Sequence, residues 1–198
     1  AGSLQGSASG VVTVSVSLSG RQYGAASLVA SINSALKSSG CPASALQLEI
    51  TESMVMQDAQ GALATLHQLN AMGVHFSIDD FGTGYSSLSY LKRLPVQKLK
   101  IDRSFIRDIE TDSNDRAIVD AIQTLAKKLG LSTVAEGVET HAQFDILRLL
   151  VCDAYQGYLF ARPCPSDEFR RILQRTHSDL QPVTGPRRSR RGTFPHPG

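Results

Sequence analysis

Cysteines, aromatic residues and long apolar runs are all scarce in this sequence of 198 residues. The three cysteines, Cys41, Cys152 and Cys164, form no C-x-x-C pair, which argues against a zinc cluster or a disulfide framework and favours a reducing compartment. No apolar run approaches the ~18 residues that a membrane-spanning helix needs, and the uncharged first twenty residues lack the basic start of a signal peptide. The sequence therefore predicts a cytoplasmic globular protein.

Charge is distributed unevenly along the chain. Residues 1–174 hold 15 basic and 17 acidic side chains, whereas residues 175–198 hold five arginines and one aspartate. This basic tail lacks apolar periodicity, so we expect residues 175–198 to be disordered and solvated, with a phosphate or membrane-surface role as the alternative. Residues 1–10, rich in Gly, Ser and Ala, are typical of a linker. We therefore assign the folded domain to residues 11–174.

That domain alternates between two periodicities, one of strands and one of helices. Residues 12–18 alternate apolar and polar side chains, as a strand does, and helical spacing follows from Leu28 to Leu36. Thr140 and Gln143 have the spacing of a capping box that opens a later helix. The pattern predicts six strands over 12–18, 46–51, 74–80, 98–102, 131–135 and 155–160, with helices between them and a last helix over 166–174.

Six strands separated by helices indicate a parallel sheet, which is either open or closed as a barrel. An open sheet covered by helices on both faces needs apolar residues on both faces of each strand. Here four strands carry a polar face, which favours a TIM-barrel-like α/β fold with its site at the carboxyl ends of the strands. Each unit takes about 30 residues and a full barrel needs roughly 250, so about six of eight units are present.

Three carboxylates follow neighbouring strands and are the candidate chemistry of the barrel. Glu49 ends the second strand, and Asp79 and Asp80 end the third. Carboxylates this close need a cation between them, and an all-oxygen ligand set suits Mg²⁺ or Mn²⁺. An Asp pair can bridge two ions about 4 Å apart, as in phosphodiester hydrolysis. The alternative is that each acid is a helix N-cap.

A glycine-rich loop follows the aspartate pair, with the sequence Gly82-Thr83-Gly84-Tyr85-Ser86-Ser87. Ser87 stands where the dinucleotide-binding fingerprint has its third glycine, so a Rossmann-like dinucleotide enzyme is the weaker hypothesis. We interpret the glycines as giving the backbone the conformational freedom that a mobile active-site loop needs, and an ordinary turn remains the alternative.

Five segments in order resemble the signatures of the EAL-domain family: Leu48–Ser53, Asp79–Leu88, Lys98–Asp102, Ala135–Glu139 and Gln156–Tyr158. The resemblance extends from about Val12 to Leu173. It implies a bacterial signalling phosphodiesterase that hydrolyses cyclic di-GMP to linear pGpG with two Mg²⁺ or Mn²⁺ ions, on a modified TIM barrel.

Transferred residue by residue, the resemblance implies that Glu49 and Asp79 hold one metal ion, and that Asp79, Asp80 and Glu136 hold a second. Lys100 and Glu136 are the implied catalytic residues, with Lys100 on the attacking water, while Gln156 contacts water or substrate. Glu52 is the implied anchor of the active-site loop, whose residues include Phe81, Gly82, Thr83 and Gly84. From the residues alone, Lys100 is equally a charge partner for Glu49, and Glu136 a structural cap.

Two departures from the family pattern affect the first metal. The Glu-Ala-Leu strand, with its metal-ligating glutamate, lies upstream of Val12 in the family and is not in this sequence, and Ser17 stands where the family has a ligand asparagine. A serine hydroxyl on a shorter stem is a poorer ligand. The sequence therefore predicts a compromised metal site and an impaired phosphodiesterase. A catalytically degenerate cyclic di-GMP receptor, or a protein-interaction domain, is the alternative.

Expected partners follow from the same resemblance and from the charge. They are cyclic di-GMP and either a second copy of the chain or an upstream signalling domain, whereas DNA, RNA and a membrane span are not expected. Because six strands do not close a full barrel, we also expect the strands at 12–18 and 155–160 to be unpaired edges that favour self-association.

Overall fold

The fold is described from a computed structural model, which describes residues 2–6, 12–23, 25, 27–57, 61–84 and 88–179. The chain divides into two compact units, and the first ends at Ala161. The second begins at Arg162 and contains helix α9 (Ser166–Asp179), whose first turn carries the acidic Asp167 and Glu168. The strands that carry the candidate site all lie in the first unit.

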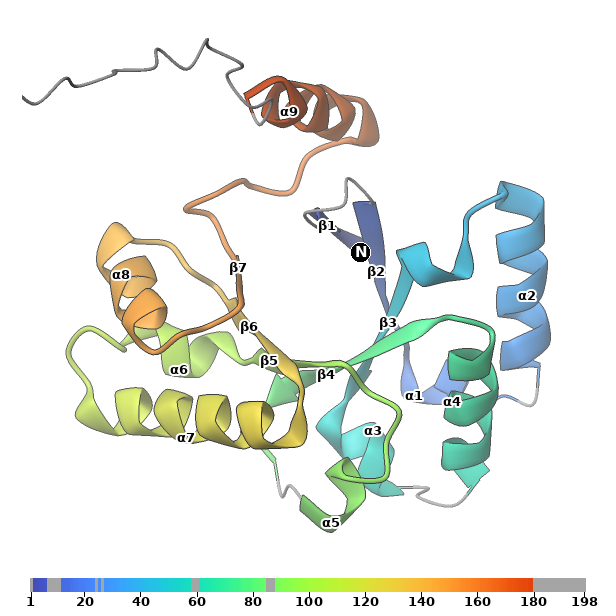
Figure 1. Cartoon of the computed structure of the whole chain (residues 1–198), viewed down its shortest axis with the longest axis horizontal. Helices are drawn as coiled ribbons and strands as arrows, with labels where there is room; N and C mark the ends of the chain where they lie inside the picture. The colour runs from blue at the N-terminus through green and yellow to red at the C-terminus, as the bar shows by residue number, and fades with distance from the viewer. Residues whose placement is uncertain are drawn as a thin grey trace, which may run out of the picture. The chain divides into compact units, whose positions relative to one another are not determined.

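The first unit is built on one curved sheet in which strand order equals chain order. Strands β2 to β7 pair in parallel and form half of a barrel, while β1 pairs antiparallel with β2 (Figure 1). This confirms the predicted α/β, TIM-barrel-like architecture with six parallel strands. The strands are β1 (Gly2–Gly6), β2 (Val12–Ser17), β3 (Leu46–Thr51), β4 (His75–Phe81), β5 (Lys98–Ile101), β6 (Ser132–Glu136) and β7 (Ala154–Gln156).

Helices connect successive parallel strands, as βα units require. In Figure 1, α2 and α4 lie beside the β2 end of the sheet, and α7 and α8 lie beside the β5–β7 end. The helices of this unit are α1 (Gly20–Tyr23), α2 (Leu28–Ser39), α3 (Glu52–Gln57), α4 (Gly61–Ala71), α5 (Leu88–Leu91), α6 (Arg103–Arg107), α7 (Ser113–Leu129) and α8 (His141–Leu149), with a 3₁₀ turn, η1 (Ala43–Ala45).

Local sequence signals fix the ends of the longer helices. The predicted capping box is confirmed, since the Thr140 side chain accepts the Gln143 backbone N–H and the Gln143 side chain accepts the Thr140 backbone N–H. The Asp112 side chain caps α7 by accepting the backbone N–H groups of Asn114 and Asp115, and Gly130, at φ 70°, ends the helix in a left-handed turn. The connections on this side of the sheet therefore have defined geometry, which positions the strand ends that follow them.

The core lies between the outer face of the sheet and the helices. Phe76, Leu99, Ile101 and Ala135 are fully buried on the strands, and Leu66, Leu69, Ile106, Val119 and Leu147 meet them from the helices. The inner face is polar, with Ser15, Gln47, Ser77 and Lys100 all at most 3% exposed. This confirms that polar residues share one face of the strands, and it leaves the ends of those strands to carry the chemistry.

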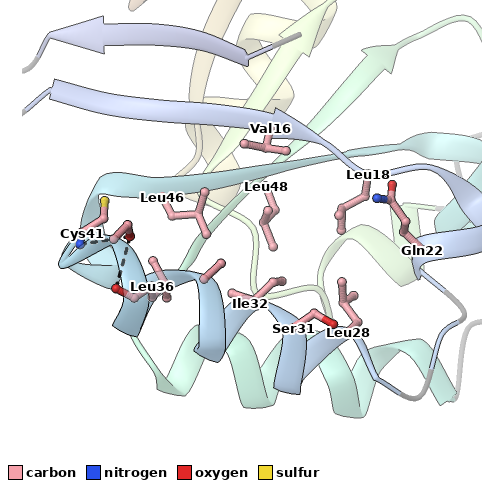
Figure 2. A pocket seen from close by; sticks show the side chains of 12 residues that line it. Val16, Leu18, Gln22, Leu28, Ser31, Ile32, Leu36, Cys41, Leu46 and Leu48 are labelled. Atoms are coloured by element: carbon pink, nitrogen blue, oxygen red, sulfur yellow. Dashed lines mark hydrogen bonds between the residues drawn. The ribbon is translucent and has the colours of Figure 1, made fainter.

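Packing is looser behind β2 than behind the central strands. An apolar cavity of about 450 Å³ lies between α2 and the outer face of β2 and β3 (Figure 2). Val16 and Leu48 line its sheet side, and Leu28, Ile32 and Leu36 line its helix side. Val16 remains 39% exposed although it lies in a strand. The β2 end of the sheet is thus underpacked.

Three predicted boundaries were wrong. Gly2–Gly6, expected to be linker, pairs with β2, because an exposed strand edge binds any extended backbone whatever its side chains. The first parallel strand is consequently not an unpaired edge. Strand β7 ends at Gln156 rather than at residue 160, because a turn begins at Gly157, whose carbonyl accepts the Phe160 N–H.

Helix α9 continues to Asp179, past the expected start of the disordered tail, because Arg175 and the residues after it contain no helix breaker before Pro182. Residues 180–198 lie outside the described part of the chain, as do residues 7–10 of the expected linker. Among the described helices, none has the length and apolar character that a bilayer crossing demands.

Candidate metal centre at the strand ends

Five neighbouring strands deliver polar side chains to one end of the half-barrel. Parallel strands in register bring their carboxyl ends to the same edge of the sheet. Glu49 lies on β3, Asp79 and Asp80 on β4, Lys100 on β5, Glu136 at the end of β6 and Gln156 at the end of β7. Glu136 and Gln156 are paired directly in the register of β6 and β7. Residues that the sequence separates by about a hundred positions therefore converge.

Lys100 lies at the centre of this cluster. Its Nζ atom is 2.9 Å from Glu49 Oε2, 2.8 Å from Asp79 Oδ1 and 2.8 Å from Glu136 Oε1, and its side chain is only 4% exposed. Burial by itself lowers the pKa of Lys100, but the three carboxylates outweigh burial and raise it above its usual range. Lys100 is thus a permanently charged group that partly neutralises three acids.

Asp79 and Asp80 serve the same site although they are consecutive in a strand. Adjacent side chains of a regular strand point to opposite faces. The pairing of β4 with β5 shifts register between Ile78 and Phe81, and Asp80 has a φ of 54°, in the left-handed region that non-glycine residues rarely adopt. This local distortion turns both carboxylates toward one site, and backbone strain of this kind is typical of functional positions.

Asp79, Asp80 and Glu136 form a group that could hold a metal ion. Each offers a carboxylate oxygen, and the three oxygens lie within 4.8 Å of one another. Two further oxygens nearby, Glu49 Oε1 and Gln156 Oε1, are buried and have no hydrogen-bond partner within the described residues. Buried acceptors without donors are costly unless a cation or water meets them. The oxygen-only set fits Mg²⁺ or Mn²⁺.

Two acids of this group, Asp80 and Glu136, have pKa values raised above those of exposed carboxyls. Burial raises the pKa of Glu136, and burial together with the neighbouring Asp79 raises the pKa of Asp80. Such shifts indicate that the negative charges are only partly compensated by Lys100. A divalent cation would supply the missing positive charge.

Asp102 is a neighbour of the cluster for which sequence reasoning gave no role. It follows β5, caps α6 by accepting the Ser104 N–H at 2.9 Å, and shares a hydrogen bond with Asp80. Burial would raise the pKa of Asp102, but the hydrogen bonds from Ser104 lower it below its usual range, whereas burial raises the pKa of Asp80. Its place after Lys98 and Lys100 in the alternating polar face was the available signal.

The predicted loop residues follow directly from β4. Phe81 is buried in the core at the strand end, and the Gly82 N–H donates to Glu52 Oε2 at 3.4 Å. A side chain at Gly84 would approach the Glu52 carboxylate at 3.2 Å, and Thr83 Oγ1 donates to the Asp80 carbonyl at 2.8 Å. Glu52, 8% exposed at the start of α3, therefore lies where a loop anchor is expected.

Ser17, at the end of β2, is the last polar group of the site. Its hydroxyl donates to Glu49 Oε2 at 3.1 Å, the same oxygen that Lys100 contacts. Ser17 thus completes the environment of Glu49 but offers no carbonyl or carboxylate toward a cation. The β2–β3 side of the site has one carboxylate, whereas the β4–β6 side has three.

Comparison with known proteins relates the chain to one domain family. The EAL domain family matches residues 2–163. The Pseudomonas aeruginosa bifunctional diguanylate cyclase/cyclic di-GMP phosphodiesterase MucR is 53% identical over 155 residues, which are 78% of this chain and 23% of that protein. The chain therefore spans about a quarter of that relative's length.

Two solved structures share the fold. The PaMucR phosphodiesterase in complex with c-di-GMP has a TM-score of 0.77 and 52% identity, covering 79% of this chain and 64% of that one. The Klebsiella pneumoniae BlrP1 complex with manganese and cy-diGMP has a TM-score of 0.71 and 33% identity, covering 77% of this chain and 39% of that one.

Proposed function

The chain belongs to the EAL-domain family, and from this premise we propose that it is a phosphodiesterase domain for cyclic di-GMP, which it converts to linear pGpG. The observation that carries the proposal is the ammonium of Lys100 within 2.9 Å of three carboxylates, two of which belong to the acidic group that fits a divalent cation. The similarity to MucR, whose name includes cyclic di-GMP phosphodiesterase, and to the BlrP1 complex with manganese and cy-diGMP supports the proposal.

Asp79, Asp80 and Glu136 would hold one Mg²⁺ or Mn²⁺ ion, and Glu49 with Asp79 a second. Bound metal ions lower the pKa of a water and stabilise the negative charge that develops on a phosphodiester. Lys100 orients the attacking water and stabilises developing negative charge at its fixed ammonium, because its three carboxylate contacts keep it in place. Gln156, whose side-chain oxygen lacks a described donor, positions water or substrate beside Glu136.

The activity of residues 1–198 is proposed to be impaired. Two-metal catalysis needs both ions in register, and the Glu49 side of the site offers only a serine hydroxyl from β2. The alternative function is a receptor that binds cyclic di-GMP without cleaving it. The residue type at position 17 favours this alternative, because its hydroxyl donates to Glu49 Oε2 and offers a first metal no carbonyl or carboxylate oxygen.

The proposal also covers the cellular location, the ligand and the partners of the domain. We place the domain in the cytoplasm, with cyclic di-GMP as ligand and with a homodimer or an upstream signalling domain as partner. The net negative charge of residues 1–174 argues against a general basic surface for DNA or RNA, and we propose that metal ions or local arginines attract the anionic dinucleotide.

The test is an assay of purified residues 1–198 with Mn²⁺ and cyclic di-GMP, following pGpG by chromatography and ligand binding by calorimetry. Turnover well below about 1 per second, abolished in Asp80→Asn but kept in the exposed-helix control Asp120→Asn, supports an impaired phosphodiesterase. Binding without any turnover supports the receptor. Turnover at or above about 1 per second contradicts the impairment, and neither binding nor turnover contradicts both functions.

A further inference from the structure

Two glycines lie where the loops after β6 and β7 meet at backbone contact distance. A Cβ atom added at Gly157 would collide with two backbone atoms of Val138, the carbonyl oxygen and the nitrogen. No side chain can be accommodated there, because a peptide backbone cannot rotate away as a side chain can. Gly157, just after Gln156, is thus in direct backbone contact with the segment that follows Glu136.

Hydrogen bonds surround this contact on both sides. The Val138 N–H donates to the Gln156 carbonyl at 3.0 Å, and the Leu159 N–H donates to the Val138 carbonyl at 3.0 Å. The two bonds enclose Gly157 and continue the β6–β7 pairing beyond its last register pair, Glu136 with Gln156. The relative position of these two site residues therefore depends on a backbone contact that only glycine permits.

Gly137 makes the corresponding contact in the other direction. A Cβ atom there would lie 2.7 Å from the Arg103 Cβ atom, and its φ of 72° lies in the left-handed region. Arg103 opens α6, three residues after Lys100. The segment Gly137–Val138 therefore lies between Arg103, just after β5, and Gly157, just after β7.

We propose that Gly137 and Gly157 are positioning residues of the metal centre, which set the Glu136 carboxylate beside Lys100 and Gln156 by letting three strand ends approach at backbone distance. The glycines touch neither substrate nor metal, and they act through Glu136. This inference rests on the proposed function, since it assigns the contact a role in metal binding.

The first experiment measures Mn²⁺ affinity of Gly157→Ala by calorimetry, with far-UV circular dichroism as a check of folding. Groups that orient metal ligands typically contribute about 10–100-fold in affinity, and we expect a loss in this range. Gly20→Ala is the matched control, because Gly20 has no neighbour within 4 Å and no positive φ. An affinity of folded Gly157→Ala within about twofold of the control overturns the proposal.

A second experiment tests whether the Mn²⁺ affinity lost in Gly137→Ala can be restored by a change at Arg103, the residue that the added methyl group would meet. Gly137→Ala should weaken Mn²⁺ binding more than Gly130→Ala, which has a similar φ of 70° but nothing within 4 Å. Adding Arg103→Gly removes the atom that the new methyl group meets, so the double variant should regain the affinity of Arg103→Gly alone. Failure of this rescue overturns the proposal, and the pair keeps it testable if Gly157→Ala does not fold.

A readout that needs no metal separates this inference from the proposed function. The amides of Val138 and Leu159 should be protected from hydrogen exchange in the wild type and in the Gly20→Ala and Gly130→Ala controls, and should lose protection in Gly157→Ala. If the wild type binds no Mn²⁺, the proposed function fails, and amide protection alone decides whether the glycines hold the strand ends. Unchanged protection in Gly157→Ala overturns the inference.

Discussion

The two sides of the candidate site differ in both packing and charge. On the β4–β6 side, Lys100 meets the carboxylates of Asp79 and Glu136 above fully buried strand residues. On the β2–β3 side, Ser17 and Glu49 stand in front of an apolar cavity of about 450 Å³. Metal ligands keep their positions only when the residues behind them are tightly packed. Within the described residues, we find such packing behind the β4–β6 side and a cavity behind the β2–β3 side.

The largest expected effect comes from removing the group that joins the two sides, as in Lys100→Met. Leaving three buried carboxylates without their cation should cost about 3–5 kcal/mol of unfolding free energy, measured by urea denaturation at pH 7. Because the pKa of Lys100 is raised, this stabilisation is fully present at neutral pH and is lost only in strongly alkaline solution. Saturating Mn²⁺ should restore part of it.

The control for this variant is Lys128→Met, which removes an exposed lysine near the end of α7 and should change stability by less than about 0.5 kcal/mol. A loss below about 1 kcal/mol in Lys100→Met would show that the carboxylates are solvated and that the two sides are not coupled through the lysine.

A comparison of Asp80→Asn with Ser17→Ala tests which side binds metal. Asp80 belongs to the group of three converging carboxylates, so Asp80→Asn should weaken Mn²⁺ binding by at least about 100-fold. Ser17→Ala removes only a hydroxyl that bonds to Glu49 and should change the affinity by less than about threefold. Calorimetry that finds the reverse order would mean that the β2–β3 side carries the surviving metal.

Ser17→Asn should reduce the difference between the sides. An amide on a longer stem can place a carbonyl oxygen where the serine hydroxyl now bonds to Glu49, which should strengthen a second, weaker Mn²⁺ equivalent by about tenfold. Ser38→Asn, an exposed change on α2, serves as the control. A titration curve that is identical for both variants would exclude Ser17 as the residue that limits this site.

The smallest expected effect is on pH dependence. The pKa values of Asp80 and Glu136 are raised chiefly by burial, so protons compete with metal above the usual carboxyl range. The metal-free fold should lose stability as pH rises through the raised pKa values, while Mn²⁺ affinity should increase by about threefold per pH unit just above the usual carboxyl range. Asp80→Asn should flatten this dependence, and an affinity that falls with rising pH would contradict the assignment.

Periodic features were predictable from the sequence, and their outcomes follow physical expectation. The alternation around Glu49 and Lys100 placed both on the polar face, and the spacing of Thr140 and Gln143 gave a helix start that the structure confirms. These signals are local, so they need no knowledge of the neighbouring strand. The parallel direction of the strands followed from the alternation of strands and helices.

Non-periodic features were not predictable. The register shift that turns Asp80 toward Asp79 depends on how β4 meets β5, and strand β1 forms because β2 offers a free edge rather than because of its side chains. The backbone contact between Gly157 and Val138 follows the last register pair of β6 and β7, and it depends on the loops after both strands. Each of these features depends on contact with a second segment that is distant in the sequence, so the local residue pattern does not predict it.

The sheet order has a consequence for how this protein is made. Because β2 to β7 pair in the order in which they are synthesised, each strand can join its predecessor as it leaves the ribosome, and no strand waits for a distant partner. Glu49 and Asp79 are in place early, but Glu136 and Gln156 arrive with the last two strands. A nascent chain that ends before β6 can therefore assemble its core without yet acquiring a complete metal centre.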